Sequence, residues 1–389
     1  MLMFSILLFF ISGFIIFWTM IGYPIFLKLL ENLYKNRKLN KNYQYTPTVT
    51  VLVVAHNEEE VIYKKLTNLI QVDYPKKLLK IIVSSDNSTD NTNELVRLFK
   101  RNNPGENIIL YEVKERRGKT NAQNEAQKLV DSEILVMTDA NAMFKKDAIR
   151  ELVSSFVDKD ISYVCGRLVY INYSDNKVAA NENTYWEKEM RVREIESNIQ
   201  TITAGNGAIY ACRNSEYFNF KPIQSHDSNM PRYYALKGNR ALFNPDAIAY
   251  EKAGEIIEDE FKRKVRMNRS ILKAILPNIS ILNIFKYKWY TVFFISHRSF
   301  RNLLWLAHLI FFISNIPLAL YLDIFKIPLV LQMIFYLLAF IKQLTGINHK
   351  YINLIHYYCM TISAQWVGVY NMLTGQSKPY WDKAESTRK

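Results

Sequence analysis

Twenty-seven residues without a charged side chain limit what this chain can fold into more than any other feature. Residues 1–27, MLMFSILLFFISGFIIFWTMIGYPIFL, contain no Lys, Arg, Asp or Glu. A helix of about 20 apolar residues is long enough to cross the hydrocarbon core of a bilayer. No cationic segment precedes the run and no small-residue cleavage site follows it, so we expect a membrane anchor rather than a removed signal peptide.

Basic residues follow this run and predict the side of the membrane on which the next part lies. Residues 28–41 carry one acid, Glu31, against five basic side chains: Lys28, Lys35, Arg37, Lys38 and Lys41. Because positively charged flanks stay on the cytoplasmic side, we expect a cytosolic domain on a multi-pass protein of the cell (inner) membrane. The three scattered cysteines suit a reducing compartment and exclude a thiolate metal cluster.

Apolar segments return near the C terminus. Residues 303–322, 327–341 and 351–377 lack charged side chains, which predicts about three membrane segments, the middle one short. Residues 284–300 mix basic and aromatic side chains, as in a helix that lies in the membrane interface. Three crossings would leave the basic tail outside, against the charge rule, so we expect one segment to be re-entrant or to lie flat.

Between the apolar ends, strand-like and helix-like runs alternate. The strand-like runs are 48–57, 79–87, 107–113 and 132–141, and the helix-like runs are 58–71, with acids in its first turn, 91–101, 119–130 and 147–157. This alternation predicts an α/β domain with a mostly parallel sheet covered on both faces. The predicted organisation is an anchor (1–30), a basic linker (31–47), the α/β domain (48–270), an interfacial region (271–301), C-terminal transmembrane helices (302–377) and a basic tail (378–389).

Polar residues stand where three of these strands end. They are His56-Asn57-Glu58 after the first strand, residues 86–90 after the second and Asp139-Ala140-Asn141 after the fourth. The carboxyl ends of parallel strands meet at one edge, where open α/β sheets bind ligands. Asp139 and Asn141 are spaced to direct oxygens at one hard cation. The alternative is that Asp139 caps the next helix, and Ser88, Thr89 or Asp90 could likewise cap the helix after the second strand.

A basic turn precedes the helix-like run 119–130. Arg116, Arg117 and Lys119 surround Gly118 there. Amide groups and cations at a helix start favour a phosphate. The alternative is a solvated basic turn.

Several stretches resemble, in order and spacing, the inverting nucleotide-sugar glycosyltransferases of family 2. They are VLVVAHNEEEVIYKKLTNL, VSSDNSTDNT, RRGKTNAQNEA and ILVMTDANAMF, continued by AGNGAIYACRN, HDSNMPRYYALKGNRALFNPDAIAYE and EFKRKVRMNRS. The resemblance covers about residues 48–269 and, more loosely, the flanking membrane segments. It implies a GT-A fold, a Rossmann-like and mostly parallel sheet, flanked by transmembrane helices as in membrane-integrated polysaccharide-synthase-like members.

The resemblance also implies a binding site for the nucleotide of the donor. Ala55, Asn57 and Glu58 would border the nucleoside. Asp86 would hydrogen-bond the uracil or other base, and Lys119 would lie near the diphosphate.

The resemblance further implies a metal and a base. Asp139 and Asn141 match a D-x-D motif whose acids hold Mg²⁺ or Mn²⁺ against the diphosphate. Asn141 is neutral, so metal affinity would be lower or Asp139 would act almost alone. Asp227 matches the catalytic base, while His226 replaces an acid and could tune Asp227 when charged or be structural.

Contacts to the acceptor or the diphosphate are expected at four positions. They are Gly205, Gly207, Arg263 and Arg266. The Q-x-x-R-W motif of processive synthases appears only as RKVRM at 263–267, with Arg266 kept, which leaves processivity open.

These features predict a membrane-bound inverting glycosyltransferase (hexosyl- or N-acetylhexosaminyltransferase). It would move a sugar from a nucleotide-sugar, expected to be a UDP-sugar, to a polysaccharide or lipid-linked acceptor in cell-surface polysaccharide biosynthesis. The alternatives are a single-transfer lipid or polyprenyl-phosphate glycosyltransferase and a catalytically silent scaffold that binds a nucleotide-sugar.

Much of the net charge of +14 borders membrane segments, so we expect the lipid bilayer and no nucleic acid as a partner. The donor sugar, the linkage and the oligomeric state are left open.

Overall fold

The structure, a computed structural model, describes residues 2–34, 39–172, 177–254 and 256–380. The chain forms two compact units: Leu30–Ile256 with Asn283–Tyr290 and Lys378–Lys389, and Met1–Leu29 with Ile257–Leu282 and Thr291–Ser377. The first is the α/β unit and the second is the apolar helical unit. Six basic residues of the predicted linker and tail lie outside the described residues: Lys35, Arg37, Lys38, Lys383, Arg388 and Lys389.

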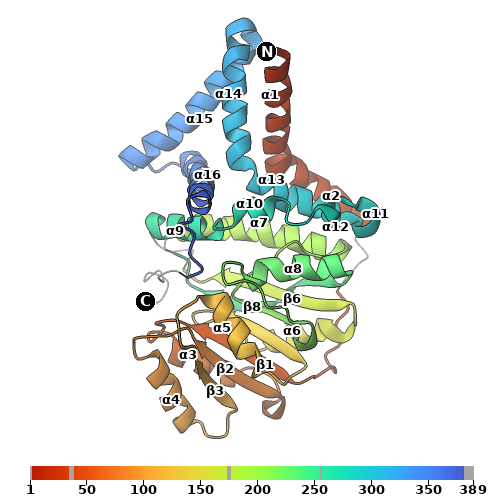
Figure 1. Ribbon diagram of the computed structural model, residues 1–389, viewed down its shortest axis with the longest axis vertical. Helices are drawn as coiled ribbons and strands as arrows, with labels where there is room; N and C mark the ends of the chain where they lie inside the picture. Colours follow the sequence, from red (N-terminus) through yellow and green to blue (C-terminus); the bar gives the residue numbers. More distant parts are fainter. Residues whose placement is uncertain (1, 35–38, 173–176, 255, 381–389) are drawn as a thin grey trace. The chain divides into compact units, whose positions relative to one another are not determined.

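The α/β unit is built on one sheet of eight strands in the order β3-β2-β1-β4-β7-β6-β8-β5 (Figure 1). β1 to β4 pair in parallel, and β6 pairs in parallel with β8, whereas β7 and β5 are antiparallel to their neighbours. The α/β fold is therefore confirmed, with a mixed sheet because β7 and β5 reverse direction. The strands are β1 Val49–Ala55, β2 Leu79–Ser85, β3 Ile108–Glu112, β4 Ile134–Asp139, β5 Met143–Phe144, β6 Ile161–Tyr170, β7 Tyr210–Arg213 and β8 Arg240–Glu251.

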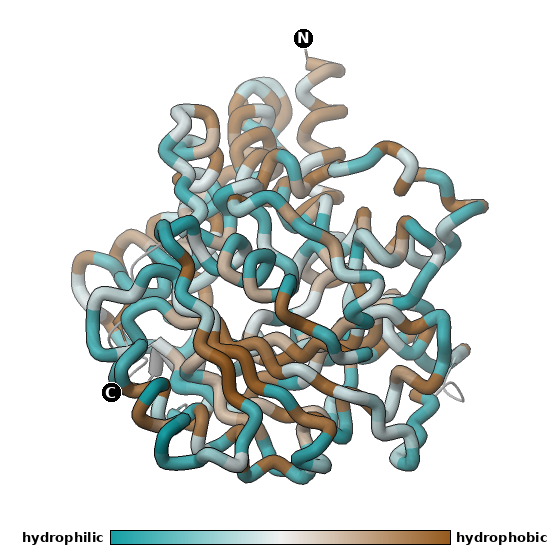
Figure 2. The backbone as a smooth tube through the Cα atoms, turned by 60° about the horizontal axis from the view of Figure 1, so that its bottom comes forward, coloured by the Kyte–Doolittle hydropathy of each residue, from teal (hydrophilic) through white to brown (hydrophobic). Residues whose placement is uncertain are grey.

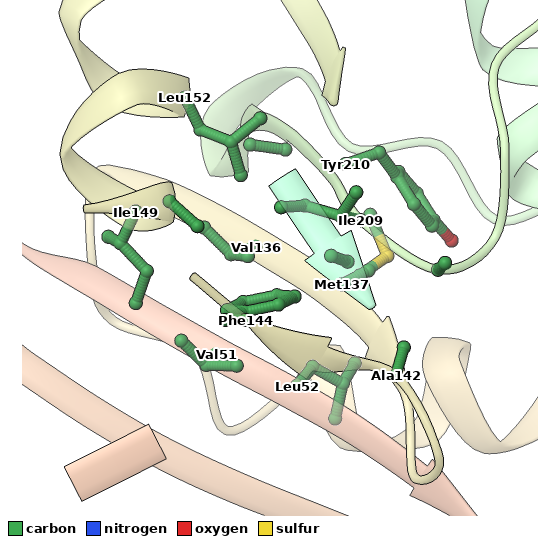
Figure 3. Packing of buried hydrophobic residues seen from close by; sticks show 14 of the residues in the cluster. Val51, Leu52, Val136, Met137, Ala142, Phe144, Ile149, Leu152, Ile209 and Tyr210 are labelled. Carbon is green, nitrogen blue, oxygen red and sulfur yellow. The ribbon is translucent and has the colours of Figure 1, made fainter. Parts of the chain in front are cut away.

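The central strands are apolar on both sides because helices cover both faces of the sheet. In β4 every residue before Asp139 is buried, and in β1 all but Val54 are buried. Figure 2 shows these hydrophobic strands together in the α/β unit. In Figure 3, Ile149 and Leu152 of α6 lie beside Val136 and Phe144 in the core of this unit.

Helices of the α/β unit follow the strands as the alternation predicts. The chain steps outward from β1 to β3 and then returns to β4, so right-handed crossovers place α3 and α4 on one face and α5 on the other. The predicted acids are not in the first turn of α3, because residues 58–61 form a turn in which Glu58 O accepts from Val61 N and Ile62 N. The helices are α3 Ile62–Ile70, α4 Thr92–Asn102, α5 Lys119–Gln127, α6 Ala148–Ser154, α7 Lys177–Ile199 and α8 His226–Lys237.

Three helical stretches in the described part of the chain are long and apolar enough to cross a membrane: Leu2–Tyr34, Leu304–Tyr321 and Asp323–Thr345. They comprise α1 (Leu2–Phe17) with α2 (Tyr23–Tyr34), α14 (Leu304–Tyr321) and α15 (Lys326–Thr345). α16 (Lys350–Leu373) is not among them, although the sequence predicted a third C-terminal membrane segment there. Its polar residues, which include Asn353, Gln365 and Asn371, lower its hydropathy.

Within the helical unit, α1 and α14 pack against each other (Figure 1). Phe9 and Phe311 stack with ring centroids 4.4 Å apart. A Cβ at Gly13 would lie 3.0 Å from the Phe311 ring, so the small residue permits this close approach. The shorter helices α9 (Ile257–Met267) and α10 (Ile271–Ile275) belong to the same unit.

Candidate active site

The carboxyl edge of the sheet gathers the predicted polar strand ends. In the sheet register, Val54 of β1 lies opposite Asp139 of β4, and Ala55 of β1 lies opposite Ser85 of β2. The chain leaves β1 toward β2 on one side and reaches β4 on the other. The residues that follow these three strands therefore meet at the switch point of the topology, where α/β sheets bind ligands.

Asn57 joins the loop after β1 to the loop after β2. Its backbone is left-handed (φ 54°), which asparagine tolerates better than most residues. The Asn57 side chain accepts from Thr89 N (2.8 Å) and donates to Thr89 Oγ1 (3.2 Å), while its own N–H donates to Ser88 Oγ (3.1 Å). The buried Glu58 follows, and its N–H donates to Thr92 Oγ1 (2.8 Å). Asn57 and Glu58 thus fix the two loops expected to hold the nucleoside.

Asp86 organises the basic turn before α5. Its carboxylate accepts from Arg117 N (3.1 Å) and Gly118 N (2.8 Å), and its own N–H donates to Ala55 O (2.8 Å). Gly118 has a φ of 91°, which favours glycine. A carboxylate has more acceptor positions than these two bonds use, so the expected contact with a base stays a prediction.

The capping alternatives are resolved differently at two acids. Asp90 precedes the N-cap residue Asn91, and its carboxylate accepts from Thr92 N (3.0 Å), the first amide of α4, so it satisfies a free amide at the helix start. Asp139 does not, because α6 begins at Ala148 and Asp147 is the residue before it. The position of Asp139 at the tip of β4 therefore calls for another explanation.

Three side chains converge around Gly207. Lys119, the first residue of α5, forms an ion pair with Asp139 Oδ1, and its Nζ lies 3.4 Å from Gly207 O. A Cβ at Gly207 would lie 2.9 Å from Lys119 Nζ, 3.4 Å from Asp139 Oδ2 and 3.8 Å from Asp227 Oδ2. Glycine thus leaves room among a cation and two carboxylates that come from three separate segments.

Asp227 is held at this point by its backbone. It is the second residue of α8, and its carbonyl accepts from Gly205 N (2.9 Å) and from the Tyr163 hydroxyl (3.4 Å). A Cβ at Gly205 would lie 1.9 Å from Tyr163 Oη, so a larger residue does not fit. Gly205, expected to contact the acceptor, therefore packs against the segment that presents Asp227.

His226 is a neutral structural residue in this arrangement. It is 1% exposed, and burial, together with the charge of Lys119, lowers its pKa to about 3. Its Nδ1 lies 2.8 Å from Gln123 Oε1, an acceptor, so Nδ1 carries the proton, and its Nε2 lies 2.8 Å from the Tyr217 hydroxyl. The geometry favours the structural alternative over a charged partner for Asp227.

Asn141 stands two residues after Asp139. It is 8% exposed, and its Nδ2 donates to Glu251 Oε1 (2.8 Å). Among the described residues no cluster of three or more His, Cys, Asp or Glu is arranged as a metal site. One carboxylate and one amide oxygen still suit Mg²⁺ or Mn²⁺ when substrate phosphates complete the coordination, so Asp139 and Asn141 would hold it.

Arg263 and Arg266 lie on α9, which belongs to the helical unit. Arg263 pairs with the buried Glu260 (Nε to Oε2, 2.8 Å), and Lys264 pairs with the other oxygen (3.3 Å). Burial opposes the charged form of Glu260, but these two cations outweigh burial and lower its pKa. The expected contact of Arg263 and Arg266 with the acceptor or diphosphate stays a prediction.

Lys65 supports the site from behind, and the sequence analysis did not name it as a site residue. It is fully buried in α3, and its Nζ donates to Thr138 Oγ1 (3.0 Å) and to Ala142 O, on either side of Asp139 and Asn141. Burial lowers the pKa of Lys65 to about 7, opposed by the charges of Asp139 and Glu251. A signal was present, because Lys65 occupies a buried position in the helical spacing Ile62, Lys65, Leu66, Leu69.

Known proteins match both the sequence and the fold. Residues 50–218 match the family model described as Glycosyl transferase family 2. Poly-beta-1,6-N-acetyl-D-glucosamine synthase of Staphylococcus aureus (strain COL) is 24% identical over 309 residues, 78% of this chain and 73% of that protein. The probable glycosyltransferase YdaM of Bacillus subtilis is 31% identical over 175 residues, 42% of this chain and 41% of that protein.

A solved structure matches over nearly the whole chain. It is the mannosyltransferase PcManGT from Pyrobaculum calidifontis, in complex with GDP-Man and Mn²⁺, with a TM-score of 0.70 and 21% identity over 94% of this chain and 99% of that one. The α/β unit is thus a glycosyltransferase family 2 domain with the GT-A fold. The chain is distantly related to a polysaccharide synthase, and three of its described helical stretches are long and apolar enough to cross a membrane.

Proposed function

We propose that this protein is an inverting glycosyltransferase that moves a sugar from a nucleotide-sugar, a UDP-sugar, to a polysaccharide or lipid-linked acceptor. The observation that carries the proposal is the convergence of Lys119, Asp139 and Asp227 on Gly207. Inverting transfer needs a base for the attacking hydroxyl and positive charge for the leaving diphosphate. The cluster offers both within one site.

Asp227 is the proposed base. In a single in-line displacement, the acceptor oxygen forms a bond to the anomeric carbon as the bond from that carbon to the diphosphate oxygen breaks. The proton of the acceptor hydroxyl passes to the Asp227 carboxylate. General base catalysis of this kind contributes about 10²–10⁴ in rate.

Lys119 is the proposed partner of the diphosphate. Lys119 is the first residue of α5. It follows the turn in which the Asp86 carboxylate accepts hydrogen bonds from the Arg117 and Gly118 amides. Mg²⁺ or Mn²⁺, held by Asp139 and Asn141, would add charge stabilisation to the leaving group. Lys119 pairs with Asp139 in the structure and would shift toward the phosphate oxygens when the donor binds.

The polysaccharide acceptor rests on the Staphylococcus aureus relative, which is named for synthesis of an N-acetylglucosamine polymer. By that likeness the protein acts in cell-surface polysaccharide biosynthesis. A single transfer to a lipid-linked acceptor is the second candidate. It is favoured by Arg263, which stands where the processive motif has Gln and is engaged by Glu260.

The test is release of nucleoside diphosphate by the detergent-purified full-length protein across UDP- and GDP-sugars, with and without Mn²⁺ or Mg²⁺. We expect one donor to support release, and Asp227→Asn to lose at least about 100-fold in turnover while keeping nucleotide affinity. Asp131→Asn changes an exposed acid before β4 and should match the wild type. Undiminished turnover in Asp227→Asn would remove this residue as the base, and product length would separate one transfer from many.

A further inference from the structure

Glu251 ends β8 beside the tight reversal that carries Asp139 and Asn141. The reversal is closed by a hydrogen bond from Ala142 N to Asp139 O (3.3 Å), after which β5 pairs antiparallel with the end of β8. This register brings the buried Asn141 to Glu251, with Nδ2 2.8 Å from Oε1. The contact is therefore set by strand pairing rather than by a mobile surface side chain.

The chemistry of the pair fixes the orientation of the Asn141 amide. A carboxylate only accepts hydrogen bonds, so the NH₂ group of Asn141 must face Glu251. The opposite orientation would place two oxygens 2.8 Å apart. Glu251 thus directs Oδ1 of Asn141 away from itself, which leaves an oxygen rather than a nitrogen for a cation.

The reversal carries one acid, Asp139, where the D-x-D pattern has two. Asp139 is paired with the Lys119 ammonium, and the Lys65 ammonium lies behind the same reversal, bonded to Thr138 Oγ1 and Ala142 O. Asn141 brings no charge where the D-x-D pattern has its second acid. Two protein cations would then face a divalent cation with Asp139 as the one acid of the motif, and Glu251 provides a further carboxylate one hydrogen bond behind Asn141.

We propose that Glu251 is a positioning residue for the cation, and that the Asn141–Glu251 pair replaces the second acid of the D-x-D motif. This inference rests on the proposed function. Asn141 contributes the oxygen, and Glu251 orients it and supplies the negative charge. Partners behind metal ligands commonly change metal affinity by about 10- to 100-fold when they are removed.

The test measures Mn²⁺ binding to the full-length detergent-purified protein by electron paramagnetic resonance of free Mn²⁺, with UDP or GDP present. Glu251→Gln keeps an oxygen acceptor for Asn141 but removes the charge, and we expect the Kd for Mn²⁺ to rise at least about tenfold. The double variant Asn141→Asp/Glu251→Gln exchanges the acid and the amide. It keeps both the hydrogen bond and the charge, so we expect most of the affinity to return.

Glu112→Gln is the matched control. Glu112 also ends a strand, β3, and also accepts from an asparagine amide, Asn93 Nδ2 (2.9 Å). Its replacement should leave Mn²⁺ affinity unchanged. Thermal melting of all variants separates loss of the cation from loss of the fold, and the double variant tests the pair even if Glu251→Gln alone is unstable.

Three results would overturn the inference. Glu251→Gln with the affinity of the wild type would show that the charge is not used, and a folded double variant without recovery would show that Glu251 does not act through Asn141. Either leaves the proposed function intact, since nucleoside diphosphate release by the wild type tests it independently. Wild-type protein that binds no Mn²⁺ with either nucleotide would remove the proposed cation and this inference together.

Discussion

At the scale of single residues, glycine positions determine how closely the reactive side chains approach one another. Gly205 and Gly207 stand in one short loop, the first against Tyr163 and the second among Lys119, Asp139 and Asp227. Neither has a positive φ in the structure. Both are therefore explained by the space that their missing Cβ leaves, not by backbone conformation.

Gly205→Ala tests this packing argument. The new Cβ would meet Tyr163 Oη at 1.9 Å, so the loop or the ring must shift, and we expect a loss of about 1–3 kcal/mol in the free energy of unfolding. Transferase activity should fall as well, because Gly205 N holds the Asp227 carbonyl. Thermal melting and nucleoside diphosphate release measure the two effects.

Two further variants make that test specific. Gly105→Ala is the control, since a Cβ there has no atom within 4 Å. Adding Tyr163→Phe to Gly205→Ala removes the hydroxyl and should restore part of the stability. Equal melting of Gly205→Ala and the wild type would show that the loop adapts without cost.

At the scale of elements, α3 supports the end of β4 from behind. Lys65 reaches Thr138 and Ala142, and Asn68 exchanges two hydrogen bonds with the Phe144 backbone (2.7 and 2.8 Å). The Lys65 ammonium also lies 4.0 Å from the centroid of the Phe144 ring. The reversal that carries Asp139 is thus fixed by polar side chains that a helix projects into the core.

Burial of Lys65 should appear as a pH dependence of stability. Its pKa is about 7 in the folded protein and 10.5 ordinarily, so between these values the unfolded chain binds more protons than the folded one. Stability must therefore rise with pH across this window, by up to about 1.4 kcal/mol per pH unit. Below pH 7 both states are protonated and the full cost of burying the charge is present.

Lys65→Met removes the titrating ammonium group and serves as the comparison. We expect the melting temperature of the wild type, relative to Lys65→Met, to increase between pH 7 and pH 9 in the same detergent. The contributions of other titrating groups cancel in the difference between the two melting temperatures. Parallel curves for the two proteins over this range would mean that Lys65 keeps its ordinary pKa when folded.

At the scale of the whole molecule, the number of membrane helices bears on the orientation of the chain. One candidate span precedes the α/β unit, and two, Leu304–Tyr321 and Asp323–Thr345, follow it. Two crossings after the α/β unit would return the chain to the side from which it started. We propose that both the residues after α2 and the basic tail are cytosolic, which satisfies the charge rule that three later crossings would break.

Cysteine labelling tests this orientation. Asp131→Cys introduces a thiol at a side chain that is 80% exposed, while Cys165 and Cys212 are buried and Cys359→Ser removes the remaining background. A membrane-impermeant maleimide should label this variant in inside-out vesicles and not in intact cells. The Cys359→Ser protein alone should stay unlabelled in both. Labelling of the Asp131→Cys thiol in intact cells would place the α/β unit outside.

The sequence by itself determined the alternation of strands and helices in the first half of the α/β unit and the polar residues at the ends of β1, β2 and β4. These follow from local periodicity and from the rule that parallel strands share a carboxyl edge. The apolar anchor is equally local. Each of these features can be read within a window of about 20 residues, because side-chain spacing reports directly on the face that is buried.

Tertiary structure alone decided which of these residues share a site. Four contacts join segments that lie 42 to 110 residues apart along the chain. They are the approach of Asp227 to Asp139, the hydrogen bond to Gln123 that sets the tautomer of His226, the contact of Gly205 with Tyr163 and the pairing of Asn141 with Glu251. Such contacts depend on strand order and register, which local sequence does not encode. The same reason explains why helical spacing, which marks Lys65 as a buried position of α3, did not show that Lys65 lies beneath the proposed cation site.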